Sequence, residues 1–147
     1  MRRFFFLTTA LLLIVSANAF GQTAKPGDEE AAVRRAVEGY LHGLKFNDVE
    51  SLKKAFWPEA KLFFVKNDGK LGQLTQSQWY EGFAASAGKE EKGELKITDV
   101  DITDNAASVK VEEDYPGSVY VDYLSLLKFD GEWRIVNKIY TSRRKKP

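Results

Sequence analysis

The segment Ser118–Tyr140 constrains the fold more than any other part of this 147-residue chain. Two runs rich in apolar, β-branched and aromatic residues meet there at Asp130-Gly131. Asp-Gly between two such runs favours a type I′ turn, because both central residues of that turn need positive φ. Apolar residues occupy both faces of the first run. The segment therefore predicts a central β-hairpin that is covered on both sides.

The N-terminus has the order of a secretory signal peptide. Arg2 and Arg3 precede an apolar run, and an Ala-x-Ala pattern ends at Ala19. The apolar run is shorter than the roughly 20 residues that cross a bilayer. We therefore expect residues 1–19 to be removed and the mature protein to be exported, soluble and not membrane-bound, either in a periplasm or secreted.

The remaining chain suits a single domain. We expect residues 20–27 to be a flexible lead-in, residues 28–142 to be the folded domain and residues 143–147 to be a basic tail. Loss of the signal peptide leaves 20 basic and 21 acidic residues, a formal charge of −1. This near-neutral balance argues against a nucleic-acid partner.

Three helices are predicted ahead of the main sheet. The first begins at the acidic residues from Asp28 and has an apolar stripe that includes Tyr40. Asn47 is expected to cap the second, which ends before Pro58. Thr75 opens the third in a T-x-x-Q capping box.

Strands make up the rest of the domain. A hairpin that turns at residues 67–69 separates the second and third helices, and period-two alternation then continues from residue 94 to residue 143. Short turns between these later runs predict a four-stranded antiparallel meander. Helices followed by such a sheet define an α+β fold, here a cone in which the three N-terminal helices pack on a curved antiparallel sheet.

The order of these elements carries a family resemblance. Its most specific parts are DYLSL at residues 122–126 and GxWxIVNKxY at residues 131–140. With these motifs the chain resembles the nuclear transport factor 2-like superfamily and, within it, the putative lumazine-binding group, over residues 28–141. The resemblance implies a cone-shaped fold that holds a small-molecule ligand.

Ketosteroid isomerases of the same superfamily resemble the first part of the chain. That resemblance places Tyr40 at the position of the tyrosine in their oxyanion hole. It places Phe64 where their general-base aspartate belongs and Ser125 where their second acid belongs. Because phenylalanine cannot accept a proton, the isomerase reaction is not expected.

No cofactor and no metal site are expected. His42 is the only histidine and the chain has no cysteine, so the ligands of a zinc site are missing. Asp99, Asp101 and Asp104 lack the glycine and the final glutamate of an EF-hand loop. We assign Asp99 and Asp101 to the solvent-facing side of a strand, Asp104 to the turn that follows, and the acidic residues 112–114 to an exposed strand end.

The leading hypothesis is a protein that binds a small apolar or aromatic molecule inside the cone, with no catalytic residue assigned. A carboxylate at Asp122, in an apolar strand, needs a partner, and Lys138 is expected beside it as a structural or ligand-binding polar pair. The candidate pocket residues combine rings for the walls with hydroxyl groups: Tyr40, Trp57, Phe64, Trp79, Tyr123 and Ser125.

Two alternatives stay open. One is an enzyme that uses Tyr40 or Asp122 in acid–base chemistry, and the other is a protein-interaction module with a filled interior. The parity of the last strand decides what the outer face of the sheet presents, and an aliphatic and tyrosine-rich outer face would favour a homodimer. We expect Trp133, Ile135 and Ile139 in the core, and Val136, Lys138 and Tyr140 on the outer face.

Overall fold

The computed structural model describes residues 26–146. The signal peptide expected over residues 1–19 and most of the lead-in lie outside the described residues. Among the helices described, none is both long enough and apolar enough to cross a bilayer. In chain order the elements are α1 (Pro26–Phe46), α2 (Val49–Ala55), β1 (Phe56–Val65), β2 (Leu71–Thr75), α3 (Gln76–Tyr80), the 3₁₀ helix η1 (Glu81–Ser86), β3 (Glu94–Thr103), β4 (Ala106–Asp114), β5 (Ser118–Phe129) and β6 (Glu132–Arg144).

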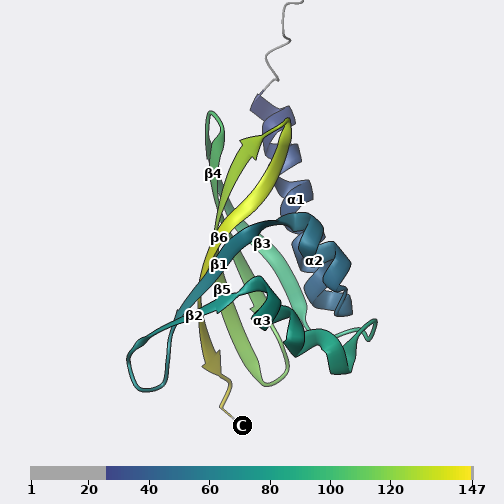
Figure 1. Cartoon of the computed structure of the whole chain (residues 1–147). Coiled ribbons are helices and arrows are strands. Elements are labelled where there is room, and N and C mark those ends of the chain that lie inside the picture. Colours follow the sequence, from purple (N-terminus) through teal and green to yellow (C-terminus); the bar gives the residue numbers. More distant parts are fainter. Residues whose placement is uncertain (1–25, 147) are drawn as a thin grey trace, which may run out of the picture.

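One curved sheet holds the six strands of residues 26–146, in the order β2-β1-β6-β5-β4-β3. The predicted α+β architecture is confirmed: α1 and α2 lie across the concave side of the sheet, and α3 closes one end (Figure 1). The sheet is mixed rather than purely antiparallel, because β1 pairs in parallel with β6. This pairing joins the predicted hairpin to the predicted meander. The sheet does not close into a barrel.

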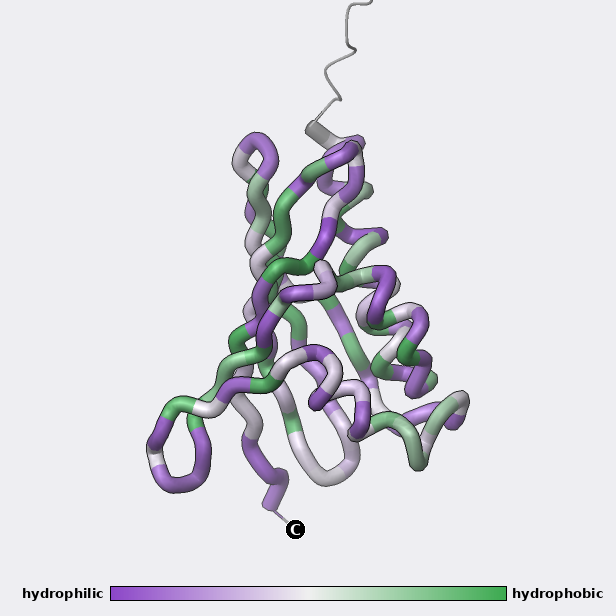
Figure 2. Tube along the Cα trace, in the orientation of Figure 1, coloured by the Kyte–Doolittle hydropathy of each residue, from purple (hydrophilic) through white to green (hydrophobic). Residues whose placement is uncertain are grey.

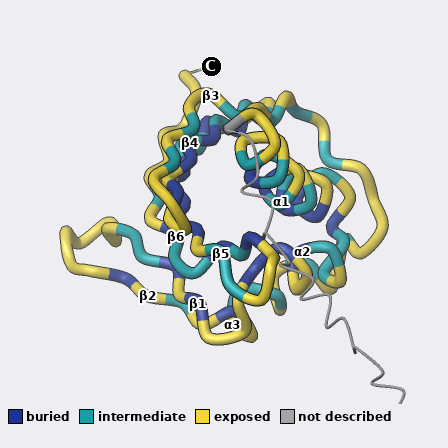
Figure 3. The backbone as a smooth tube through the Cα atoms, turned by 90° about the horizontal axis from the view of Figure 1, so that it is seen from above, coloured by how far each residue is buried: buried dark blue, intermediate teal, exposed yellow. Residues whose placement is uncertain are grey.

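The apolar core fills the space between α1, α2 and the concave face. Seen from above, the buried positions of the sheet and of α1 face one another across the interior (Figure 3). Gly43 permits the close packing of α1 on α2, since a Cβ there would overlap a methyl group of Leu52. Fully buried members of this core include Val33, Val37, Tyr40, Leu52, Phe56, Val111, Leu124, Leu126 and Ile135.

The cap of α2 differs from the prediction. Asp48, not Asn47, is the N-cap, and its Oδ1 accepts hydrogen bonds from the backbone N–H groups of Glu50 (3.0 Å) and Ser51 (3.3 Å). Asn47 has a φ of 51° and forms the turn between α1 and α2. Its side chain is therefore free to bind the loop after η1.

Two local predictions are confirmed. Thr75 and Gln78 form the capping box of α3. Asp130 and Gly131 have φ values of 52° and 81°, as a type I′ turn between β5 and β6 requires.

A β-bulge in β6 decides which side chains face the interior. Ile135 and Asn137 pair with consecutive residues of β5, so Val136 between them is an extra residue. Beyond the bulge the alternation is reversed, and our expectation for this part of the strand is wrong. Lys138 is buried, whereas Ile139 is 49% exposed on the outer face.

The β1–β2 hairpin projects beyond the body of the sheet (Figure 1). Its tip is hydrophilic, and the strand residues next to the tip are hydrophobic (Figure 2). Val65 and Leu71, at the two strand ends, are 71% and 69% exposed. Together with the outer face of β5 and β6, they form an apolar surface on the side of the sheet away from the helices.

Candidate functional site

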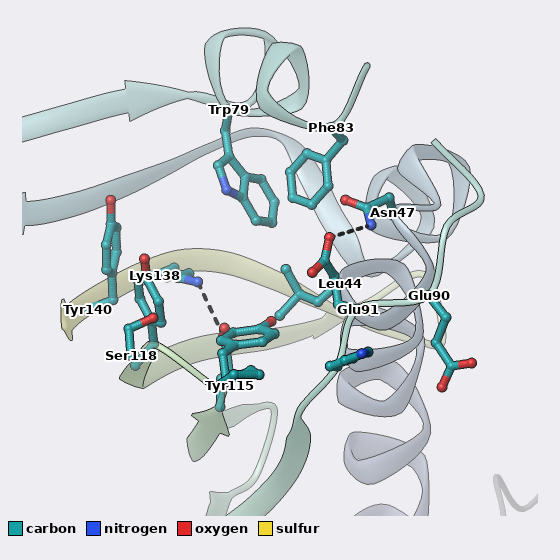
Figure 4. Close-up of a pocket in the computed structure, with 14 residues that line it drawn as sticks. Leu44, Asn47, Trp79, Phe83, Glu90, Glu91, Tyr115, Ser118, Lys138 and Tyr140 are labelled. Atoms are coloured by element: carbon teal, nitrogen blue, oxygen red, sulfur yellow. Dashed lines mark hydrogen bonds and ion pairs between the residues drawn. The ribbon is translucent and has the colours of Figure 1, made fainter. Parts of the chain in front are cut away.

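A cavity of about 700 Å³ opens where α3 and η1, the end of α1, and strands β4 to β6 come together. The loop that follows η1, residues 88–93, borders it. Figure 4 shows that side chains from all these elements converge on this space. Its lining includes the rings of Trp79, Phe83, Tyr115, Tyr120 and Tyr140, and the polar side chains of Asn47, Glu90, Glu91, Lys92, Glu113, Ser118 and Lys138.

Four buried polar side chains meet at the base of this cavity, and we call them the polar floor: Tyr40, Glu113, Asp122 and Lys138. They come from four elements, α1, β4, β5 and β6, so tertiary folding alone brings them together. Tyr40 and Asp122 are fully buried, and Glu113 and Lys138 are 4% and 5% exposed. Charged groups this deeply buried are costly unless they are paired and hydrogen-bonded.

The contacts of the floor are short. The ammonium of Lys138 lies 2.6 Å from Asp122 Oδ2 and 2.5 Å from the hydroxyl oxygen of Tyr40. Tyr40 also forms a short hydrogen bond with Asp122 Oδ2. Glu113 Oε1 lies 3.0 Å from the Tyr40 hydroxyl but 3.8 Å from the Lys138 nitrogen, outside hydrogen-bond reach of the ammonium.

Proton counting shows that one carboxyl of the floor is protonated. Tyr40 has one proton but lies within hydrogen-bond distance of both Asp122 Oδ2 and Glu113 Oε1, so one of these two carboxyls must supply the proton of its own bond. Asp122 makes the tight ion pair with Lys138, whereas Glu113 lies 3.8 Å from that ammonium, so we assign the proton to Glu113. With Glu113 neutral, the floor holds one anion, Asp122, and one cation, Lys138, and its net charge is zero.

The electrostatics of Glu113 agree with this assignment. Burial raises the pKa of its carboxyl to about 8; the Lys138 charge opposes this rise, and the Asp122 charge adds to it. Burial, followed by the charges of Asp122 and Glu113, raises the pKa of the Tyr40 hydroxyl well above its usual value. Tyr40 is therefore a neutral donor at ordinary pH.

Aromatic rings surround the lysine. Its nitrogen lies 5.1 Å from the ring centroid of Tyr40, 5.4 Å from that of Trp79 and 5.0 Å from that of Tyr140. The negative faces of such rings attract a cation and favour a positive charge at this position. Lys138 is thus held as an ammonium between the carboxylate of Asp122 and the aromatic wall of the cavity.

One carboxylate oxygen of the polar floor is unpaired within residues 26–146. Asp122 Oδ1 is buried and has no hydrogen-bond partner within residues 26–146. Buried polar atoms without a partner are rare in native proteins. The ion pair with Lys138 is made by the other oxygen of the same carboxylate.

The loop beside the cavity is tied to the end of α1. Lys45 Nζ donates to the carbonyl oxygens of Glu91 (2.7 Å) and Gly93 (3.0 Å). Asn47 Nδ2 donates to the carbonyl oxygen of Lys89 (2.9 Å) and to Glu91 Oε1 (3.1 Å), the second of which is drawn in Figure 4. These bonds hold the loop as one wall of the cavity.

Several of the predicted site residues meet at this place. Tyr40 belongs to the floor, Trp79 lies in the wall, and Asp122 and Lys138 form the ion pair. The cost of an unpaired carboxylate in an apolar strand pointed to that pair.

The other predicted pocket residues lie elsewhere. Tyr123 and Ser125 point to the outer face, because they alternate with the inward-facing residues of β5. Phe64 stacks on Tyr140 at 5.2 Å and borders the outer apolar surface. Trp57 is 40% exposed and packs edge-on against a ring at the end of β5.

Sequence reasoning missed Glu113, which we had assigned to a solvated strand end. In β4, Ala107, Val109 and Val111 are buried in alternation, and Glu113 continues the same face. Extending that period-two pattern by one more step would have indicated an inward-facing carboxyl.

The fold defines a class, the nuclear transport factor 2-like (NTF2-like) proteins. An NTF2-like protein of unknown function from Shewanella baltica is 26% identical, with a TM-score of 0.76 over 83% of this chain and 99% of that one. Another, from Silicibacter pomeroyi, is 26% identical with a TM-score of 0.73 over 82% and 100% of the two chains. Within this class the chain belongs to the family described as "Putative lumazine-binding", whose model matches residues 28–141.

These findings confirm the family resemblance inferred from the strand motifs. A further relative is the aldolase FrzH of Cladobotryum sp, which is 27% identical over 116 residues, covering 78% of this chain and 91% of the aldolase.

Proposed function

We propose that this protein binds a small, partly aromatic molecule in the cavity above the polar floor. The observation that carries the proposal is a cavity of about 700 Å³ lined by Glu113 and Lys138, two buried polar groups that are held by Tyr40 and Asp122. Ligand sites of this size combine ring-lined walls with a few well-placed polar groups. The ring of the ligand packs against Trp79 and Phe83, and its polar end faces Glu113 and Lys138.

Charge limits the ligand further. At neutral pH the floor carries no net charge, because Glu113 is protonated and Asp122 neutralises Lys138. Adding an unpaired charge to such a buried place is unfavourable. An uncharged ligand whose oxygen accepts a hydrogen bond, such as a carbonyl compound, therefore suits this site best.

Native mass spectrometry of the protein, purified from its source and then mildly denatured, tests this proposal. We expect a released small molecule, and we expect Trp79→Ala to reduce its retention. Trp57→Ala is the matched control, since that indole lies away from the cavity. An adduct-free mass, together with no rise in melting temperature with flavin-like or steroid-like compounds, would contradict the proposal.

Aldol-type catalysis is a second candidate function. Two observations favour it: the similarity to an aldolase over most of that enzyme's length, and a buried carboxyl beside an ammonium at the cavity base. Aldol reactions need a base near a carbonyl group and a positive charge near its oxygen. The proposed enzyme uses Glu113 as the base, in place of the Tyr40 or Asp122 that sequence reasoning suggested.

We also propose export of the mature protein to a periplasm or the medium, based on the N-terminal pattern of charged, apolar and small residues. Intact-mass measurement of the protein from its source tests it. A mature chain that begins at Phe20 is expected, and a full-length chain found inside the cell would contradict the proposal.

A homodimer through the outer sheet face is likewise proposed. Tyr123 and Ile139 are cross-strand partners there, both 49% exposed, and Leu127 is 42% exposed. Such an exposed apolar face suits self-association about a two-fold axis. Light scattering after size-exclusion chromatography should give twice the chain mass, and Ile139→Lys should halve it. A monomeric wild-type protein would contradict this proposal.

A further inference from the structure

We propose that Glu113 is the catalytic acid–base residue of the cavity, that it removes an α-proton from a ring-bearing ketone or aldehyde, and that Lys138 holds the carbonyl oxygen. This inference rests on the proposed small-molecule binding and deepens the aldol-type candidate, since it assigns the proton-transfer step, narrows the substrate to a ring-bearing ketone or aldehyde and gives Lys138 its role.

Glu113 is the carboxyl of the floor that borders the cavity. Asp122 is fully buried and is not one of the residues that line the cavity, and its Oδ2 contacts both Lys138 and Tyr40. Glu113 instead has one partner within the floor, the Tyr40 hydroxyl at 3.0 Å, and stays 3.8 Å from the ammonium. Its carboxyl is therefore free of a tight ion pair and can gain or lose a proton while it faces a substrate.

Lys138 is placed to bind the oxygen. An ammonium has three N–H groups, and Asp122 and Tyr40 take two of them. Lys138 also lines the cavity, and we assign its third N–H to a ligand. In a carbonyl compound only one atom separates the oxygen from the α-carbon. One substrate group can thus contact Lys138 and Glu113 together.

The proton transfer balances within the site. The Glu113 carboxylate takes the α-proton, the C–H electron pair forms the C=C bond of an enolate, and the carbonyl π pair moves to the oxygen beside Lys138. The ammonium stabilises this developing negative charge at the buried base of the cavity. Return of the proton to the α-carbon restores the ketone. Attack of the enolate on a second carbonyl forms a C–C bond, and Glu113 then protonates the new alkoxide.

Neighbouring groups set the pH range of this step. With its pKa at about 8, Glu113 is a carboxylate in about a tenth of molecules at pH 7 and in most molecules above pH 9. Exchange should therefore rise with pH. The ionisable groups around it are Tyr40 from α1, Tyr115 after β4, Asp122 from β5, Lys138 from β6, and Glu90, Glu91 and Lys92 on the loop that lines the cavity.

The test uses 2-tetralone, a bicyclic aromatic ketone, in D₂O. Proton NMR follows the loss of its α-protons, and saturation-transfer NMR follows its binding to the protein. We expect the wild-type protein to accelerate exchange over buffer, about tenfold more at pH 9 than at pH 7. Glu113→Gln keeps the shape of the protonated carboxyl, so it should fold and bind the ketone, yet lose exchange by at least about 100-fold.

Glu112→Gln is the matched control. Its side chain lies on the opposite face of β4, 3.4 Å from Lys96, and its loss should leave exchange unchanged. Bound 2-tetralone that shows no exchange, or equal exchange in Glu113→Gln, would overturn the catalytic assignment while leaving the binding function standing. A ketone-derived mass fixed on Lys138 after borohydride treatment would show an imine and contradict the role of that ammonium.

Failure of 2-tetralone to bind would contradict the carbonyl substrate class. Failure to bind combined with an adduct-free native mass spectrum would contradict the proposed binding function itself.

Discussion

Replacement of Lys138 by Met tests how the polar floor is held together. The substitution keeps most of the side-chain volume and removes the cation that lies 2.6 Å from Asp122. Asp122 is fully buried and its second oxygen has no partner within residues 26–146, so its negative charge is left without compensation. Breaking a buried ion pair in this way costs about 3–5 kcal/mol in the free energy of unfolding.

Replacement of the other partner of the ion pair, Asp122→Asn, should lower the free energy of unfolding by less than Lys138→Met does. Glu113 lies 3.8 Å from Lys138, and without the charge of Asp122 its carboxyl can ionise and neutralise the lysine. Only hydrogen bonds are then weakened, at about 1–3 kcal/mol. The structure thus predicts an asymmetry of about 2 kcal/mol between the two partners of one ion pair.

Urea denaturation at pH 7, followed by tryptophan fluorescence, measures both values. Lys53→Met is the control, because Lys53 pairs with Glu50 on the exposed side of α2 at 2.8 Å, and its loss should cost less than about 0.5 kcal/mol. Equal losses of unfolding free energy for Lys138→Met and Asp122→Asn would refute the inference that Glu113 ionises and neutralises Lys138 when Asp122 is replaced. A loss below about 1 kcal/mol for Lys138→Met would refute the buried pair.

Three further outcomes are expected. Burial raises the pKa of Glu113 from 4.5 to about 8, so between these pH values the folded protein keeps a proton that the unfolded chain releases. The free energy of unfolding should therefore fall by about 1.4 kcal/mol per pH unit between pH 5.5 and 7.5, relative to Glu113→Gln. Plots of unfolding free energy against pH that run parallel for the two proteins would contradict this. Thr75→Ala should cost about 1 kcal/mol by urea titration, whereas Thr75→Ser should cost little, since only alanine removes the cap of α3. Asn47→Gly keeps the positive φ but removes two side-chain bonds, so amide exchange in residues 88–93 should accelerate; unchanged exchange would show that other contacts hold the loop.

The parts of the fold that sequence predicts well are those with local causes. The Asp130-Gly131 turn follows from the need for positive φ, and the capping box at Thr75 follows from residue types three positions apart. The cap of α2 was missed by one residue, because Asn47 and Asp48 are both good capping residues. Asn47 is the one that adopts positive φ.

Features that depend on distant contacts escaped prediction. The parallel pairing of β1 with β6 joins segments that are separated in the chain by four strands, α3 and η1, and no turn residue signals it. No residue type in the sequence indicates the bulge at Val136 either, yet the bulge reverses which side chains of β6 face the interior beyond it. That reversal moves Lys138 from the expected outer face to the interior, and Ile139 in the opposite direction.

The candidate site was predictable in part. The cost of burying Asp122 pointed to Lys138 as its partner, whichever way the last strand faced. Tyr40 joins them because α1 crosses the concave face at that level. Glu113 was missed because a run of three acidic residues at a strand end is usually solvated, whereas this one continues a buried face.

The most direct test of the account is a carbon-13 NMR titration of the glutamate carboxyl groups between pH 4 and pH 10. We expect one carboxyl to titrate near pH 8, and we expect its signal to be absent in Glu113→Gln. That result would establish a neutral acid beside the Asp122–Lys138 pair at the base of the cavity. Titration of every glutamate below about pH 6 would contradict the charge assignment on which both the ligand class and the proton-transfer step depend.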